Sequence, residues 1–312
     1  MEVLLVAGFL GAGKTTLIRH LLTSPPKGLG KLAILVNEVG KIGLDGALLS
    51  GRNVDVVELT SGCICCSIKT DFFKAVQEIH HRFAPSHLIV EPTGVAQPGE
   101  ILDVLSQPPL KEFCRVQGIV TIVDAGFFKA KEMLGSFYDR QILGADVILL
   151  NKIDLVDEEV ALGIEARLEK MNPRARIFLT RNCSVEPARL FEGLSSVGER
   201  TGKAGFRDEN LEQEGFQSFT FEDHGVMDRA KLIRFLESLP ASVFRCKGWA
   251  RFPDSSVIVN FSGGNYRLEP AEDSHPTALV LVGRKCPQDE ILEALKRCVL
   301  PESVLEQIPG EV

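Results

Sequence analysis

A glycine-rich run near the start of the chain has the residue types and spacing of a phosphate-binding loop. Residues 8–15 read Gly-Phe-Leu-Gly-Ala-Gly-Lys-Thr and directly follow a short apolar stretch. Glycines let successive backbone N–H groups turn toward phosphate oxygens, Lys14 reaches the β and γ phosphates, and the Thr15 hydroxyl binds Mg²⁺. A helix that begins at Lys14 adds the positive end of its dipole. The expected nucleotide contacts in this run are Gly8, Gly11, Ala12, Gly13, Lys14, Thr15 and Thr16.

A second motif bears on the base of the nucleotide. Residues 151–154 read Asn-Lys-Ile-Asp and follow the predicted strand Val147–Leu150. The Asp154 carboxylate can accept two hydrogen bonds, which match the N1–H and exocyclic amine of guanine, whereas adenine offers no such pair. An ordinary strand-to-helix loop, with Asn and Asp as turn and cap residues, is the plain alternative. Behind a phosphate loop the motif favours GTP over ATP, with Asn151, Lys152 and Asp154 on the base side.

Acidic residues at two further points suit a metal ion and an attacking water. Glu91 ends a predicted strand in the sequence Glu-Pro-Thr-Gly, where a carboxylate can hold Mg²⁺ together with Thr15. Gly94 lets the backbone approach the γ-phosphate. Glu38, in the sequence Asn-Glu-Val-Gly, is a candidate for positioning the attacking water or for metal contact, and its alternative is a solvated loop acid. We expect Lys14, Glu38 and Glu91 to act in phosphoryl transfer.

Three thiols lie within four residues in the sequence Gly-Cys-Ile-Cys-Cys at 62–66. Thiolates are soft ligands that suit Zn²⁺ and its neighbours, and a tetrahedral site needs one ligand more. Cys65 and Cys66 are adjacent and point in different directions, so a turn is needed to bring them and Cys63 onto one ion. A turn with partly buried thiols and a redox pair are the two alternatives. The other five cysteines are scattered singly, as buried small apolar residues usually are.

Composition excludes several classes of protein. The 312 residues carry a net charge of -7, which gives no basic footprint for nucleic acid and no polybasic membrane anchor. No apolar run approaches the ~20 residues that span a bilayer. No positively charged leader precedes the first apolar run. We therefore expect a cytoplasmic protein, in which a reducing environment disfavours structural disulfides.

Strand and helix patterns place the motifs in an α/β domain. Short β-branched runs alternate with helical periodicity over the first two thirds of the chain. The expected strands are Val3–Ala7, Leu32–Asn37, Asp55–Leu59, His87–Glu91, Gly118–Asp124, Val147–Asn151 and Ile177–Thr180. The expected helices are Lys14–Leu22, Asp71–Phe83, Gly99–Leu105 and Glu158–Met171. This alternation favours a P-loop NTPase domain with a mostly parallel sheet covered by helices on both faces.

A polar stretch rich in Gly, Lys, Asp, Glu and Gln separates this domain from a smaller one. We expect the P-loop domain at 1–198, a linker at 199–214 and an α+β domain at 215–312. Expected elements of the smaller domain are strands at Phe216–Phe221, Val257–Phe261 and Ala278–Val282, with helices at Asp228–Leu239 and Gln288–Val299.

In this order the motifs resemble those of the CobW-type GTPases, relatives of the nickel-insertion accessory GTPases and of other metallochaperone GTPases. The matching positions are 8–16, 37–40, 62–66, 91–94, Asp124 and 151–154, and in the second domain 232–240, 245–248 and 279–284. The resemblance implies a GTPase whose hydrolysis is coupled to the handling of a metal, typically Zn²⁺, with Co²⁺ or Fe²⁺ for some members. It also implies that Cys63, Cys65 and Cys66 are the metal ligands and that an apo-metalloprotein client receives the ion. A homodimer across the nucleotide would suit this class.

Three departures from the family pattern stand out. Many members have a histidine-rich stretch, but this chain has six histidines and none clustered in the linker. Lys41 stands where an acidic residue is common, and Pro92 replaces a small polar residue beside Glu91. The histidines open as a fourth metal ligand are His80, His81, His224 and His275.

Two other functions compete with a metallochaperone. A regulatory switch would sense the metal and recruit partners without transferring it. A small-molecule kinase would use the phosphate loop on an acceptor hydroxyl, but residues 151–154 count against it because such kinases usually use ATP.

Overall fold

The computed structural model describes residues 1–25, 30–36, 54–58, 68–92, 98–130, 136–192, 194, 215–271 and 273–301, with the backbone alone for 54–58, 68–69, 130 and 136. The chain divides into two compact units, Met1–Asp208 and Glu209–Val312. The predicted linker, 199–214, lies outside the described residues.

The first unit is built on a seven-stranded sheet in which every pairing is parallel. Its spatial order is β3 (Val54–Glu58), β2 (Leu32–Val36), β4 (His87–Glu91), β1 (Glu2–Gly8), β5 (Arg115–Asp124), β6 (Val147–Asn151) and β7 (Arg176–Leu179). Strands β1, β2 and β6 read as nearly continuous apolar runs because both of their faces are buried. The predicted parallel sheet is confirmed.

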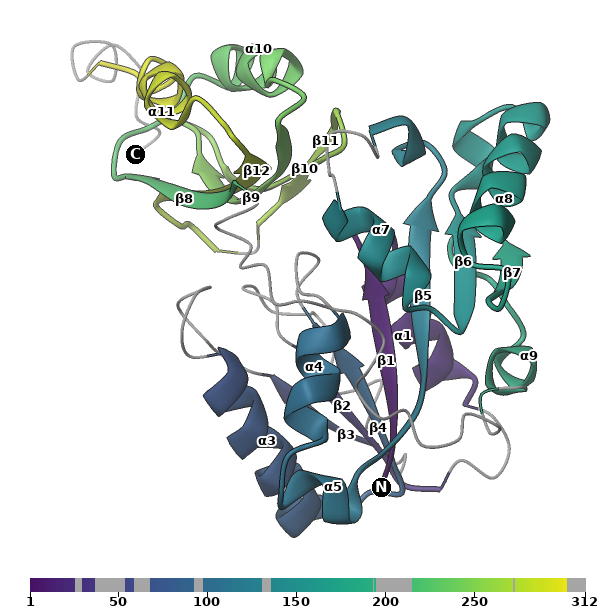
Figure 1. Cartoon of the computed structure of the whole chain (residues 1–312). Coiled ribbons are helices and arrows are strands. Elements are labelled where there is room, and N and C mark those ends of the chain that lie inside the picture. Colours follow the sequence, from purple (N-terminus) through teal and green to yellow (C-terminus); the bar gives the residue numbers. More distant parts are fainter. Residues whose placement is uncertain are drawn as a thin grey trace. The chain divides into compact units, whose positions relative to one another are not determined.

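Helices cover both faces of this sheet (Figure 1). Alternate residues of β1 show the two sides: Leu4 and Val6 pack into a core with Leu17 and Leu21 of α1, whereas Val3 and Leu5 enter a second core. That second core takes residues from α3, α4 and α5. The helical segments of this unit are α1 (Lys14–Thr23), α3 (Ile68–Phe83), α4 (Pro98–Leu105), α5 (Leu110–Phe113), η1 (Phe128–Ala130), α7 (Ser136–Leu143), η2 (Ile153–Leu155), α8 (Glu158–Met171) and α9 (Pro187–Phe191).

Strand β1 lies where the strand order reverses, with β2, β3 and β4 on one side and β5, β6 and β7 on the other. In open α/β sheets, ligands bind beyond the carboxyl ends of the strands at such a switch point. The strands β1, β4, β5 and β6 end at Gly8, Glu91, Asp124 and Asn151, respectively. These candidate site residues therefore all lie at the carboxyl edge of the sheet.

The second unit is an antiparallel sheet of five strands in the order β11-β10-β9-β12-β8. Their bounds are β8 Phe216–Asp223, β9 Val243–Arg251, β10 Ser256–Ser262, β11 Asn265–Pro270 and β12 Thr277–Arg284. Helices α10 (Arg229–Ser238) and α11 (Gln288–Lys296) pack their apolar residues into one core with alternate strand residues such as Val259 and Leu281. The predicted α+β class is confirmed.

Two strands of this sheet, β9 and β11, went unpredicted. Strand β9 alternates cations with apolar residues and contains Gly248 at φ 151, where an added Cβ would meet the Ala278 oxygen at 1.8 Å. Strand β11 is mostly exposed and pairs with β10 through a tight turn at Gly263 and Gly264, both at positive φ. A Gly-Gly pair is a hairpin signal, and it marks this turn in the sequence.

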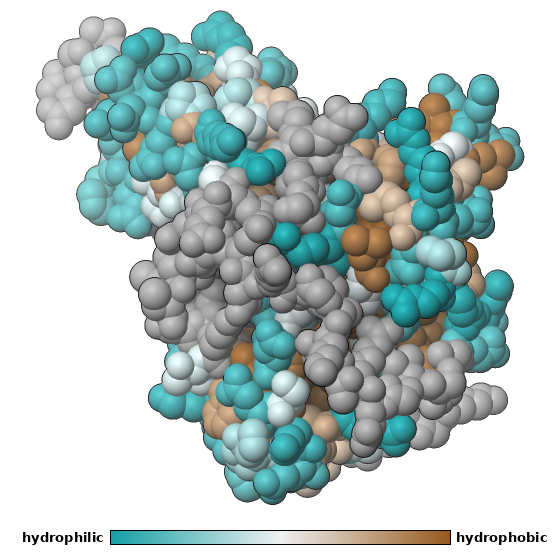
Figure 2. All heavy atoms as spheres, viewed as in Figure 1, coloured by the Kyte–Doolittle hydropathy of each residue, from teal (hydrophilic) through white to brown (hydrophobic). Residues whose placement is uncertain are grey.

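Among the described residues, large apolar side chains are mostly buried, and hydrophilic residues predominate among the coloured atoms of the face seen in Figure 2. In the described part of the chain, the exposed large ones are Leu143, Leu155, Leu162 and Trp249. None of the described helices is long and apolar enough to cross a membrane.

Candidate nucleotide-binding site

The loop between β1 and α1 requires glycine at two of its positions. Gly8 and Gly13 have φ values of 142° and 121°, which side chains rarely adopt. A Cβ on Gly8 would lie 2.6 Å from the Ile122 oxygen, and one on Gly13 would lie 2.6 Å from Asn151 Nδ2 and 2.7 Å from Cys183 Sγ. Gly13 is also the N-cap of α1, so no side chain covers the amino end of that helix. Such an end is suited to bind an anion.

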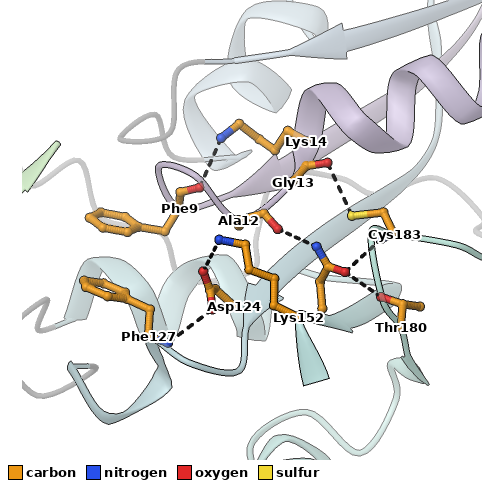
Figure 3. Close-up of polar contacts among 10 residues, drawn as sticks. Phe9, Ala12, Gly13, Lys14, Asp124, Phe127, Lys152, Thr180 and Cys183 are labelled. Atoms are coloured by element: carbon orange, nitrogen blue, oxygen red, sulfur yellow. Dashed lines mark hydrogen bonds and ion pairs between the residues drawn. The ribbon is translucent and has the colours of Figure 1, made fainter. Parts of the chain in front are cut away.

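Lys14 is folded over the start of the same loop. Its side chain is buried, and its ammonium donates to the carbonyl oxygens of Gly8 at 3.0 Å and Phe9 at 3.2 Å. Figure 3 shows the ammonium directed at Phe9 across the loop. A phosphate oxygen is a charged acceptor and forms a stronger bond than these two neutral carbonyls. Lys14 can therefore turn to a phosphate without leaving the loop.

Thr15 and Glu91 meet as their sequence predicts. The Thr15 hydroxyl donates to both carboxylate oxygens of Glu91, at 3.2 and 3.4 Å, and Glu91 is buried at the end of β4. Hydroxyl and carboxylate oxygens are the hard ligands that Mg²⁺ prefers. This pair of oxygen ligands, one of them on the residue after Lys14, fits a nucleotide-bound Mg²⁺.

Asn151 joins two loops at the carboxyl edge of the sheet. Its buried amide donates from Nδ2 to the Ala12 oxygen at 2.8 Å, and Oδ1 accepts from the Cys183 amide at 2.8 Å and from the Thr180 hydroxyl at 3.2 Å. Figure 3 shows Ala12 and Gly13 facing the segment that carries Thr180 and Cys183. We therefore assign Asn151 to the support of both loops.

Lys152 and Asp124 form an ion pair that joins the loop after β6 to the end of β5, at the same edge of the sheet. The Lys152 ammonium lies 2.6 Å from Asp124 Oδ2, and Asp124 Oδ1 accepts from the Phe127 amide at 3.2 Å. The Phe127 ring stacks on Phe9 of the phosphate loop with centroids 5.3 Å apart (Figure 3). Lys152 has φ 60°, and η2 begins directly after it with Asp154 in an exposed position. Asp154 is therefore accessible to the base of a nucleotide.

Cys183 and Thr180 escaped prediction as residues of this site. Thr180 is the last residue of the predicted strand Ile177–Thr180, and Cys183 lies three residues further on. Both come after the observed strand β7, and the carboxyl end of a parallel strand beside β6 is the signal that could have found them. Burial raises the pKa of the Cys183 thiol to about 12, so the thiol is neutral and donates to the Gly13 oxygen at 3.3 Å.

Several predicted residues lie outside the described residues: Glu38, Lys41, Cys63, Cys65, Cys66 and Gly94. Thr16 lies in the first turn of α1. Over the ranges that are described, no three His, Cys, Asp or Glu side chains are grouped to hold a metal ion. The His80 ring stacks on the Phe113 ring with centroids 4.0 Å apart, and the centroid of the His275 ring lies 4.9 Å from that of the Trp249 ring.

A phosphate loop after the central strand of a parallel sheet defines the first unit as a P-loop NTPase domain. Two family profiles match the sequence: "CobW/HypB/UreG, nucleotide-binding domain" over residues 2–179, and "Cobalamin synthesis protein cobW C-terminal domain" over residues 216–299. The chain therefore belongs to the CobW/HypB/UreG family, and it is a P-loop GTPase of the CobW type.

Relatives extend the match to almost the whole length. The zinc chaperone CobW of Pseudomonas aeruginosa is 27% identical over 95% of this chain and 91% of that protein. The zinc chaperone YjiA of Escherichia coli is 29% identical over 94% of this chain and 97% of that protein. The zinc-regulated GTPase metalloprotein activator 1 of Dictyostelium discoideum is 28% identical over 83% of this chain and 64% of that protein. Among solved structures, Zn(II)-bound YjiA GTPase aligns over 96% of this chain and 99% of that one, with 22% identity and a TM-score of 0.49.

Proposed function

We propose that this chain is a GTP-dependent metallochaperone that binds Zn²⁺ through Cys63, Cys65 and Cys66 and delivers it to an apo-metalloprotein client. The observation that carries the proposal is the P-loop site at one sheet edge of a chain that a zinc chaperone matches over 95% of its length. Along the chain, the three thiols come after β3 and before α3, and therefore after the phosphate loop and before Glu91.

The nucleotide would be held from both ends of the candidate site. Lys14 and the loop amides bind the β and γ phosphates, and Gly94 gives the γ-phosphate room. Asp154 accepts from guanine, while Asn151 keeps the loops on either side of the nucleotide in place. This division follows from exposure, since Asp154 is exposed and Asn151 is buried among protein groups.

Phosphoryl transfer needs a cation, a positioned water and neutralised charge. Bound Mg²⁺ supplies charge neutralisation on the phosphate oxygens, and Thr15 with Glu91 would hold it. Glu38 would orient the attacking water. Lys14 supplies a second positive charge from within the loop.

Zinc is the cargo, and its affinity would depend on the nucleotide. GTP orders the segments that contact the γ-phosphate, and hydrolysis releases them. If GTP tightens zinc binding, zinc must tighten GTP binding by the same factor, because coupling between two ligands is reciprocal.

The first test is Zn²⁺ affinity by competition with a chromogenic chelator, with Mg²⁺ and a non-hydrolysable GTP analogue in one sample and GDP in the other. We expect affinities that differ by about tenfold or more between the two states. Titrating Co²⁺ and Fe²⁺ in the same assay ranks the competing ions. Equal affinities in the two states would contradict coupled delivery and favour the metal-sensing switch.

The matched variants are Cys65→Ser and Cys114→Ser. Cys65→Ser should lower zinc affinity and remove the effect of zinc on GTP binding, yet leave GTP affinity without zinc unchanged. Cys114 is a free, half-buried cysteine directly before the amino end of β5, and its replacement should change neither zinc affinity nor the effect of zinc on GTP binding. Full zinc stoichiometry in Cys65→Ser would remove Cys65 from the ligand set.

A further inference from the structure

The segment after β7 holds an unusual backbone next to the phosphate loop. Asn182 and Cys183 are consecutive non-glycine residues with φ values of 50° and 53°. Such a conformation is disfavoured for residues with a side chain and persists where the surroundings impose it. The surroundings here are the phosphate loop and Asn151.

Cys183 contacts three different elements of the nucleotide-binding edge. Its thiol donates to the Gly13 oxygen at 3.3 Å, and its amide donates to Asn151 Oδ1 at 2.8 Å. Its carbonyl oxygen lies 3.3 Å from Nδ1 of His20 on α1. One residue thus meets the phosphate loop, the end of β6 and the helix that follows the loop.

We propose that Cys183 is a positioning residue, which fastens the segment after β7 to the phosphate loop so that the base side and the phosphate side of the site keep one arrangement. Gly13 directly precedes Lys14, and Asn151 lies three residues before Asp154. Cys183 is therefore hydrogen-bonded both to the residue before the proposed phosphate ligand Lys14 and to a residue close in sequence to the proposed base ligand Asp154. The inference rests on the nucleotide site proposed above.

The thiol suits this place by size and by protonation. An added Cβ on Gly13 would come within 2.7 Å of Sγ, so the sulfur occupies the room that glycine leaves. Cys183 is fully buried, and a buried neutral thiol is a donor that costs little to remove from water. Alanine removes the donor, whereas serine keeps one with a shorter reach.

The first experiment compares Cys183→Ala, Cys183→Ser and Cys246→Ala in the full chain. Loss of one hydrogen bond that positions a ligand site predicts that Cys183→Ala raises Kd and KM for GTP about three- to tenfold, with kcat changed less than about twofold. Cys183→Ser should recover most of the loss. Cys246 is an equally buried cysteine of the second unit, and its replacement should leave all three constants unchanged. A lower Tm in Cys183→Ala with unchanged Kd and KM would show a merely structural role and overturn the inference.

The second experiment needs no variant and remains informative if Cys183→Ala fails to fold. Carbamidomethylation of each cysteine of the wild-type chain is followed by mass spectrometry with and without GTP and Mg²⁺. If bound nucleotide holds the segment after β7 against the phosphate loop through Cys183, which we call the Cys183 clamp, GTP should slow the labelling of Cys183. We expect a rate about fivefold lower or more, beyond any change in the labelling rate of Cys114. Cys114 reports opening of the same unit, and Cys246 reports the other.

The outcomes separate the two proposals. Equal protection of Cys183 and Cys114 would mean that GTP stabilises the unit as a whole, and the clamp would be wrong while GTP binding stands. Failure of the wild-type chain to bind GTP would overturn the proposed function and this inference together.

Discussion

Asn151, the first residue of the Asn-Lys-Ile-Asp motif, is hydrogen-bonded to protein groups on both sides. Its amide satisfies a carbonyl of the phosphate loop, an amide of the segment after β7 and the Thr180 hydroxyl, all of them buried. Asp154, three residues later, is exposed. The motif therefore combines a buried residue that joins two loops with an exposed residue that we propose recognises the base.

Replacing these two residues should separate stability from selectivity. Asn151→Ala leaves buried partners unsatisfied, so we expect the free energy of unfolding of the first unit to fall by about 2 kcal/mol or more, measured by urea denaturation. Asp154→Asn keeps the fold but replaces two acceptors with one acceptor and one donor, so GTP affinity should fall while affinity for xanthosine triphosphate rises. An Asn151→Ala chain of wild-type stability would contradict the joining role.

Helices α1 and α8 illustrate opposite uses of glycine at the element scale. Helix α1 has Gly13 as its N-cap, and the φ and close neighbours of this glycine exclude a Cβ. Helix α8 contains Gly163, and an added Cβ there meets nothing within 4 Å. Gly13 serves the site, whereas Gly163 only raises the entropic cost of forming its helix.

The matched pair Gly13→Ala and Gly163→Ala tests this difference. Gly13→Ala should abolish detectable GTP binding, because the loop must shift away from Asn151 and Cys183 to admit a methyl group. Gly163→Ala should raise the free energy of unfolding by about 0.5–1 kcal/mol and leave GTP affinity unchanged. Calorimetric Tm and GTP titration measure both effects. Normal GTP binding by Gly13→Ala would contradict the steric account.

At the scale of the whole molecule, each unit has its own core, and each core contains at least one buried thiol. Cys183 belongs to a core of the first unit and Cys246 to the core of the second. Burial raises the pKa of each thiol to about 12, from an ordinary value of 9.0. A thiol that stays protonated in the folded state and ionises in the unfolded state links stability to alkaline pH.

The sign of this dependence follows from proton binding. Above about pH 9 the unfolded chain has lost these protons and the native chain keeps them, so each thiol lowers the free energy of unfolding by about 1.4 kcal/mol per pH unit until its native pKa is reached. The free energy of unfolding is therefore unaffected by these thiols below about pH 9, and it falls as the pH rises from about 9 to 12. Urea denaturation at several pH values from about 8 to 10.5 measures the slope.

The control for this prediction is Cys246→Ala. It removes one titrating thiol from the second unit, so the pH slope of that unit should become shallower and that of the first unit should not change. A slope in the second unit that is identical with and without Cys246 would show that other groups cause the alkaline loss.

Local sequence determined most of the first unit. Strands such as β1 and β6 are short apolar runs and the phosphate loop is a contiguous motif, so neighbouring residues carry the signal. The strands of the second unit were harder to predict from sequence because β9 carries cations and β11 is exposed. Both segments form strands by pairing with their neighbours, and β11 does so after a Gly-Gly turn.

Only the tertiary structure decided how the nucleotide edge is held together. Asn151 and Ala12 are 139 residues apart, and Cys183 and Gly13 are 170 apart, yet each pair is hydrogen-bonded. Such pairs meet because β1 lies between β4 and β5 and because β6 and β7 continue the sheet from β5. Periodicity within a segment reports its burial but carries no information about strand order. The sequence by itself therefore determined the phosphate-loop motif and indicated the candidate residues for the chemistry, whereas the strand order of the sheet decided that Asn151 and Cys183 are hydrogen-bonded to that loop.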